Sequence, residues 1–191
     1  QLAGLLVAEW RLDEAAEIYA MQDPGLSPHL RALAAFGRHE LEVLCVDVDG
    51  QRLTGIRRDR QACLEHVPGP FQLAVARAWG ALEGLALARM GKTREAIALL
   101  EEGLEAVRFN PARIIYVFHL AQAYERIGHR DLALGRYHEA TQLFPGTRLA
   151  SEARSRIAAI QASASLFRGM LPEAPAPALT PEQAAFEGAA T

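Results

Sequence analysis

The 191-residue chain contains few cysteines, few aromatic residues and a single lysine. Its two cysteines, Cys45 and Cys63, are too few for a disulfide framework, which predicts a reducing, cytoplasmic compartment. A periplasmic location stays open, because the chain begins at Gln1 rather than at Met and a leader can precede it. Aromatic residues make up only 7% of a chain rich in alanine, and this composition favours close-packed helices over a β-sandwich.

The sequence also lacks a surplus of positive charge and a long apolar run. Twenty Lys and Arg residues against 23 Asp and Glu give a net charge of -3, which argues against a general nucleic-acid binder. The longest candidate for a membrane helix, residues 114–124, is shorter than the roughly 20 residues that a span needs. The histidines form no pair at a metal-ligand spacing. We therefore expect no nucleic-acid partner, no membrane span, no metal and no cofactor.

None of the ten prolines falls within a periodic apolar run. The stretches 71–110, 112–144 and 146–171 can therefore be helical, since a proline in a helix interior breaks the hydrogen-bond ladder. Within the first two stretches apolar residues recur every three or four positions, with short breaks at Gly91 and Gly128. Short breaks between amphipathic runs predict antiparallel helix pairs.

The predicted helix pairs are similar to each other. A period in the thirties built from helix pairs indicates a solenoid, because one pair cannot bury its own apolar face and stacked neighbours bury it jointly. The spacing of Asp13, Ala15 and Tyr19 matches a third, truncated copy near the N-terminus. A shift of 37 residues aligns Ala86 with Ala123, Arg89 with Arg126, Gly91 with Gly128, Ala96 with Ala133, and Glu102 with Glu139.

Segment 114–147 resembles a tetratricopeptide repeat. Ala121 and Ala133 would let the two helices approach, Gly128 would permit the turn, and Pro145 would end the second helix. The segment 77–110 fits less closely, because Gly103 stands where the family has alanine. The positions that carry the resemblance in the better unit are Val117, Leu120, Ala121, Tyr124, Gly128, Ala133, Tyr137, Ala140 and Pro145.

This resemblance implies an all-α fold, an α-α superhelix of antiparallel helix pairs closed by a C-terminal capping helix. The repeat domain would span residues 1–169, and the Pro/Ala-rich residues 170–191 would form a disordered tail. The expected units are repeats at about 1–26, 27–67, 71–110 and 111–146, and a capping helix at 147–169.

Residues 38–58 admit two interpretations. A β-hairpin with Asp49-Gly50 at its turn would suit the partial alternation from Leu41 to Val48. A divergent helical repeat, with a helix from Ser27 to about Arg38 and a second from Arg52 to His66, suits the spacing of the neighbouring repeats. We favour the helical repeat, because an isolated hairpin is poorly stable.

In the tetratricopeptide family the first helix of each pair lines a concave groove. Carried over to this chain, the resemblance implies a partner-binding groove in which Phe118 anchors a peptide and Arg89 and Arg126 pair with its carboxylates. The expected groove residues are Leu85, Arg89, Ile115, Phe118, His119, Gln122, Glu125 and Arg126.

The function that follows is a protein-protein interaction scaffold that binds a peptide or partner protein, without enzymatic activity. An alternative is a self-assembling or regulatory domain of a larger membrane or signalling protein, with the groove filled by its own tail or by a second copy as a homo-oligomer. A remote alternative rests on Asp47 and Asp49, which resemble the first motif of Mg²⁺-dependent haloacid-dehalogenase-like phosphatases.

Overall fold

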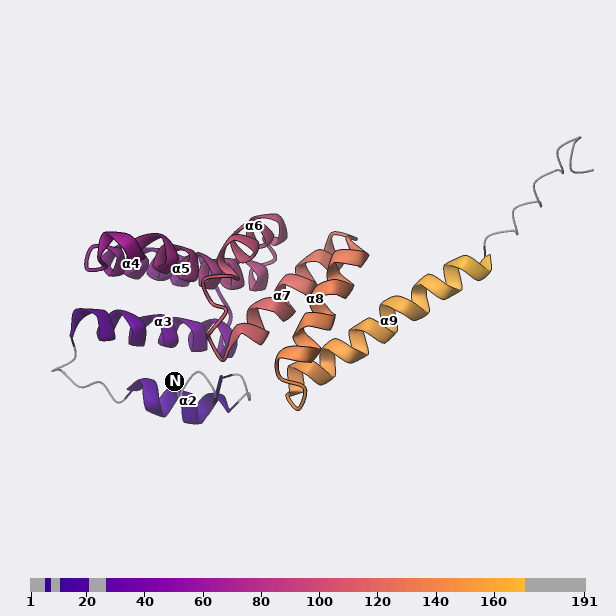
Figure 1. Ribbon diagram of the computed structural model, residues 1–191, viewed down its shortest axis with the longest axis horizontal. Helices are drawn as coiled ribbons and strands as arrows, with labels where there is room; N and C mark the ends of the chain where they lie inside the picture. Colours follow the sequence, from indigo (N-terminus) through magenta and orange to yellow (C-terminus); the bar gives the residue numbers. More distant parts are fainter. Residues whose placement is uncertain (1–5, 8–10, 21–26, 171–191) are drawn as a thin grey trace, which may run out of the picture. The chain divides into compact units, whose positions relative to one another are not determined.

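The computed structural model describes residues 6–7, 11–20 and 27–170 of the chain, and these residues contain helices and no strand (Figure 1). The prediction of an all-α fold is confirmed. The helices are α2 (Leu12–Ala20), α3 (Pro28–Cys45), α4 (Gly50–Leu64), α5 (Gly69–Arg89), α6 (Thr93–Gly103), α7 (Arg113–Arg126), α8 (Arg130–Leu143) and α9 (Arg148–Met170).

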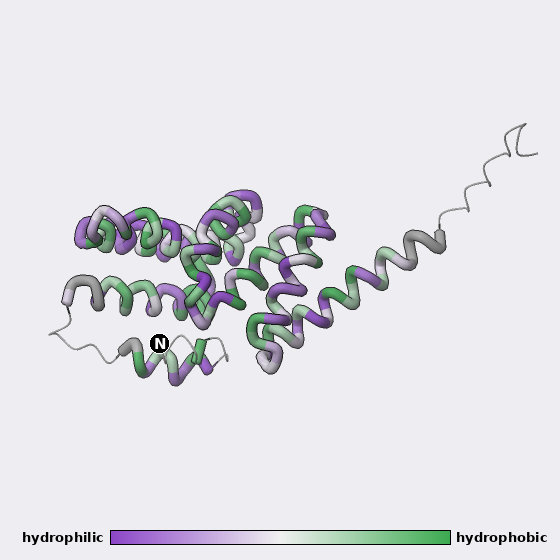
Figure 2. The backbone as a smooth tube through the Cα atoms, in the orientation of Figure 1, coloured by the Kyte–Doolittle hydropathy of each residue, from purple (hydrophilic) through white to green (hydrophobic). Residues whose placement is uncertain are grey.

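The chain divides into two compact units, Gln1–Ile160 and Gln161–Thr191, and the division falls within α9. The first unit holds α2 to α8 and the N-terminal part of α9, where Leu149, Ala153 and Ile157 are buried on one side of the helix. Hydrophobic and hydrophilic residues alternate along this helix, as Figure 2 shows. In the second unit the described residues continue α9 as far as Met170. The predicted disordered tail lies, beyond Met170, outside the described residues.

The helices of the first unit pack in a regular order. The most extensive contacts join α5 with α6 and α7 with α8, as expected of antiparallel pairs. The first helix of each pair contacts the first helix of the next, so α3 packs on α5 and α5 on α7. The second helix of each pair contacts the following first helix, as α4 does with α5 and α6 with α7. This order is compatible with stacked helix pairs.

Helix α5 is the centre of this packing. Ten consecutive residues, Trp79 to Ala88, are buried, so the helix is covered on every side rather than along one stripe. The helices α3, α4, α6 and α7 all contact it. Even the one carboxylate in this stretch, Glu83, is 5% exposed and is neutralised by Arg57 of α4, whose guanidinium lies 2.6 Å away.

The turns of the two best-formed pairs have the same backbone structure. Gly91 has φ +79° and Gly128 has φ +80°, a conformation that only glycine adopts without strain. In both turns two amides bond back to the preceding helix, for example Lys92 N–H to the carbonyl of Leu87 at 2.9 Å and Gly91 N–H to that of Ala88 at 3.2 Å. These two backbone hydrogen bonds form a Schellman motif, and they confirm the predicted turns.

The paired helices α5 and α6 approach closely because glycines lie at their crossing. A Cβ built on Gly103 would lie 2.6 Å from the Cβ of Ala81 and 2.6 Å from the carbonyl oxygen of Arg77. A Cβ on Gly84 would lie 3.0 Å from the side chain of Leu100. The glycine at position 103, where the resemblance expects alanine, therefore sets the distance between the two helices.

Residues 38–58 belong to two helices, α3 and α4, joined by a connection at 46–49, so the helical interpretation is confirmed and the β-hairpin is wrong. Helix α3 continues past Arg38 to Cys45, because Glu40, Leu41 and Leu44 are all buried on one side of it. Asp49 does not form a hairpin turn. Its side-chain Oδ1 accepts a hydrogen bond from the backbone N–H of Arg52 at 2.8 Å and caps the N-terminus of α4.

Replacing Gly103 with alanine should destabilise the protein by about 1–3 kcal/mol, because the new methyl group overlaps the backbone of α5. Gly135→Ala is the matched control, since nothing lies within 4 Å of a Cβ built there on α8. That control should gain about 0.5–1 kcal/mol through helix propensity. Urea unfolding followed by circular dichroism measures both, and equal stabilities for the two variants would contradict the close approach.

Candidate functional site

The eight residues predicted to line a groove lie on α5 and α7, and the structure divides them into two groups. Leu85 and Ile115 have no exposed surface, and Phe118 is 2% exposed. These three side chains belong to the core and are not available to a partner. Arg89 and Arg126 are exposed, and His119, Gln122 and Glu125 are half-buried. The prediction that Leu85, Ile115 and Phe118 line a groove is therefore wrong. The polar residues of the predicted groove do reach the surface.

Phe118 is buried because it faces its own partner helix. Its ring packs edge-on against Tyr137 of α8, with ring centroids 5.6 Å apart. The resemblance assigned Phe118 to the partner-binding groove as its anchor. Because α7 is buried on most of its circumference, the sequence pattern alone did not distinguish the groove side from the side that faces α8.

Leu85 lies in the buried part of α5, a helix that contacts the first helices on both sides of it, α3 and α7. The hydroxyl of Tyr116, on α7, donates a hydrogen bond to Glu40 Oε1, on α3, at 2.5 Å. The amide of Asn110 donates to the same oxygen at 3.4 Å. These contacts join the helices before and after α5, so the side of α5 between them is closed. We call Glu40, Asn110 and Tyr116 the closing cluster.

The closing cluster contains a carboxylate in an unusual state. Glu40 is 1% exposed, and burial raises its pKa to about 7, although the hydrogen bonds from Tyr116 and Asn110 oppose this rise. The group is therefore partly protonated near neutral pH. The sequence offered no signal for it, since a glutamate in a helix is ordinarily a solvated residue.

The exposed arginines of the predicted groove bond to helix ends within the protein. Arg126 Nη1 donates to the carbonyl oxygen of Ala88, in the last turn of α5, at 3.0 Å. Arg89 repeats the arrangement one pair earlier, donating to the carbonyl oxygens of Leu44 at 3.3 Å and Val46 at 3.4 Å at the end of α3. Each guanidinium therefore bonds to carbonyl oxygens at or just past the end of the preceding first helix, and the oxygen of Ala88 also accepts from Gly91 N–H.

His119 and Gln122 lie beside these arginines on α7. Burial lowers the pKa of His119 to about 4, and the positive charges of Arg89 and Arg126 lower it further. A hydrogen bond with Gln122 acts in the opposite direction. The imidazole is therefore neutral at physiological pH. We call Arg89, His119, Gln122 and Arg126 the polar rim.

Glu125, the remaining predicted groove residue, is engaged elsewhere. Tyr137 of α8 donates its hydroxyl hydrogen bond to Glu125 Oε2 at 2.7 Å, and Arg156 of α9 lies 3.5 Å from the other oxygen. This carboxylate joins α7 to the two helices that follow it. The polar rim consequently carries positive charge and no negative charge of its own.

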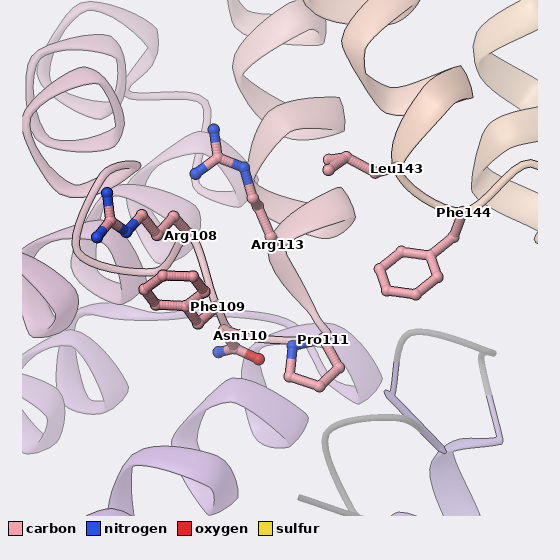
Figure 3. A pocket seen from close by; sticks show the side chains of 7 residues that line it. All are labelled: Arg108, Phe109, Asn110, Pro111, Arg113, Leu143 and Phe144. Atoms are coloured by element: carbon pink, nitrogen blue, oxygen red, sulfur yellow. The ribbon is translucent and has the colours of Figure 1, made fainter.

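A second surface feature is an open pocket of about 220 Å³ at the connection between α6 and α7 (Figure 3). Phe109 is 85% exposed there, and the guanidinium of Arg108 lies 4.4 Å from the centre of its ring. Phe144 immediately precedes Pro145, and Phe109 lies two residues before Pro111. The residues that line the pocket are Arg108, Phe109, Asn110, Pro111, Arg113, Leu143 and Phe144.

The residues of the remote phosphatase alternative lie between two helices rather than at the end of a strand. Asp47 and Asp49 lie in the connection between α3 and α4, and Asp49 caps α4. The described part of the chain contains no group of three or more His, Cys, Asp and Glu side chains that could hold a metal ion. It also contains no strand, whereas the motif belongs to an α/β domain.

Comparison with protein-family models, with curated proteins and with solved structures finds no match to this chain. Among the helices of the described residues, none has the length and apolar character needed to cross a membrane.

Phe118→Ala should destabilise the protein by about 3–5 kcal/mol, because it removes a ring that is buried against Tyr137. Phe109→Ala removes the same side chain from an exposed position and should change stability by less than about 0.5 kcal/mol. Thermal and urea unfolding measure both. A Phe118→Ala variant as stable as Phe109→Ala would contradict the burial of Phe118.

Glu40→Gln should change how stability depends on pH. The raised pKa of Glu40 means that its contribution is fully present below pH 4.5 and is lost as pH rises to about 7. A glutamine has no such loss, so the stability of the variant relative to wild type should grow by up to about 3 kcal/mol between these values.

Urea unfolding at a series of pH values measures this difference, and taking it against wild type cancels the contribution of His119. Because its pKa is lowered, the stability contributed by His119 is lost as pH falls from 6.5 to about 4. Glu105→Gln, at an exposed carboxylate, is the control. A difference between Glu40→Gln and wild type that stays constant with pH would contradict the buried, protonated state.

Proposed function

We propose that this chain is a tetratricopeptide-like helical-repeat scaffold that binds a protein or peptide through its polar rim. The observation that carries the proposal is the order of helix packing. Each first helix contacts the next first helix, and each second helix contacts the following first helix, over α3 to α7. Repeated helix pairs of this kind build extended surfaces for partners rather than a single enclosed reaction site.

The links between helix ends support the same proposal. Arg126 bonds to the end of α5 and Arg89 to the end of α3, so equivalent side chains occupy equivalent places in successive pairs. The polar rim thereby extends over two pairs, and its side chains are held by hydrogen bonds before a partner arrives. Such preorganisation lowers the entropic cost of binding.

The closed side of α5 limits how a partner can bind. Since Leu85, Ile115 and Phe118 are buried, a peptide has no apolar slot between α5 and α7 to enter. It would instead lie across the polar rim, where the guanidinium groups offer charge-assisted hydrogen bonds to carboxylates or backbone carbonyls. Contacts of this exposed kind suit a reversible partner.

Site-specific photo-cross-linking tests this function. A photoreactive residue at position 122, a half-buried place on the polar rim, should give a covalent adduct with a defined partner protein when the full chain is exposed to lysate of its source and irradiated. The same residue at position 142, exposed on α8 away from the polar rim, is the matched control and should give none.

Each outcome decides between the functions considered. An adduct at position 122 alone, with a different protein, supports the scaffold. An adduct with a second copy of this chain favours self-assembly. Equal adducts at both positions, or none at either, would overturn partner binding through the polar rim.

A further inference from the structure

The two best-formed helix turns repeat the same side-chain chemistry. One turn reads Arg89-Met90-Gly91-Lys92 and the other Arg126-Ile127-Gly128-His129, so an arginine, an apolar residue, a glycine and a second basic residue follow in that order. Both glycines have positive φ and both turns carry the same pair of backbone hydrogen bonds. The backbone therefore presents the basic residue after each glycine in an equivalent way, and both are exposed.

These turns lie next to each other. The hydrogen bond from Arg126 to the carbonyl of Ala88 joins the end of α7 to the end of α5, which are the points where the two turns begin. Helix α7 also contacts both α5 and α6 along its length. We call the exposed basic residues of the two turns the turn edge. They are Arg89, Lys92, Arg94, Arg126, His129 and Arg130.

Many arginines elsewhere in the described residues pair with carboxylates, as Arg113 does with Glu139 and Arg136 with Glu101, both at 2.8 Å. Others, such as Arg52 and Arg154, bond to backbone carbonyl oxygens instead. Among the residues that the structure describes, no cation of the turn edge forms an ion pair.

The acidic side chains of these turns do not offset that charge. The exposed carboxylates there are Glu95 and Asp131, one in the first turn of α6 and one in that of α8. Glu125, the carboxylate on α7, accepts a hydrogen bond from Tyr137 and pairs with Arg156. In a chain of net charge -3, the turn edge is therefore a local concentration of positive charge.

We propose that the turn edge binds an acidic segment of a partner protein, an inference that rests on the proposed scaffold function and names the chemistry of its partner. Charge complementarity specifies carboxylates, since unpaired guanidinium and ammonium groups favour them. Exposed apolar side chains stand among the cations, Ile127 at 36% and Leu132 at 51% exposure, and they suit a segment that carries apolar residues between its acids.

A protein segment fits this surface better than a nucleic acid does. Binding of single-stranded nucleic acid ordinarily uses aromatic side chains on which the bases stack. In the two turns the aromatic ring, that of His129, is already stacked on Tyr124 at 6.2 Å. The exposed apolar side chains of these turns, Ile127 and Leu132, are aliphatic and suit hydrophobic residues of a peptide.

Fluorescence anisotropy with the full chain tests the proposal. The probe is a labelled peptide of alternating glutamate and leucine, and the same peptide with glutamine for glutamate is its control. Wild type should bind the acidic peptide, more weakly as salt is added. Lys92→Glu with Arg130→Glu should weaken binding by at least about tenfold, because two attractions become repulsions. Neither side chain makes a hydrogen bond or ion pair within the described residues, so the fold should be unchanged.

A matched variant separates the site from the overall charge. Arg31→Glu with Arg108→Glu alters net charge by the same amount at exposed positions of α3 and of the α6–α7 connection, and it should change binding by less than about twofold. Equal losses in both variants, equal binding of the glutamine peptide, or no binding by wild type would overturn the proposal.

Two further probes distinguish the alternatives. Tighter binding of an oligouridine or of phosphatidylserine vesicles through Lys92 and Arg130 would overturn the choice of an acidic protein segment. A cross-linked partner at position 122 together with no binding of the acidic peptide would refute this inference while leaving the scaffold function intact.

Discussion

The burial of α5 on all sides is the constraint on which the rest of the structure depends. A helix with ten consecutive buried residues cannot exist at a surface, so it requires neighbours around its whole circumference. The pair partner α6 supplies one side, and α4 supplies another. The remaining side is covered because α3 and α7 are joined through Glu40 and Tyr116. The helix pairs are thus held together by the burial of α5 among its neighbours as well as by the contacts within each pair.

The same arrangement determines which surfaces are left for a partner. Closing the side of α5 removes the apolar groove that a simple stack of helix pairs would leave open. It leaves the ends of the first helices exposed, where Arg89 and Arg126 bond to carbonyl oxygens at the ends of the preceding first helices. The scaffold function proposed above would therefore use the ends of the helices rather than their middle, and charge rather than the burial of apolar side chains.

Local features of the fold could be predicted from the sequence, because their causes are local. Gly91 and Gly128 mark turns since the backbone there needs positive φ, and proline spacing bounds the helices. The orientation of Phe118 and the burial of Leu85 could not be predicted. The first depends on the contact of Phe118 with Tyr137 of α8 and the second on the helices that pack around α5, and periodicity within one helix carries no information about either. The exposed ends of the predicted site, Arg89 and Arg126, were carried over from the tetratricopeptide resemblance.

The predominance of arginine over lysine also has a structural meaning. A planar guanidinium can reach two acceptors at once, as Arg89 does at the end of α3, and an ammonium group does so less precisely. Lys92 is the one lysine of these 191 residues, and it is exposed between Gly91 and Thr93. Within these residues, acetylation, ubiquitination or an amine-reactive dye can therefore modify only one lysine side chain. That side chain lies at the N-terminus of α6, so a label on it probes the start of this helix.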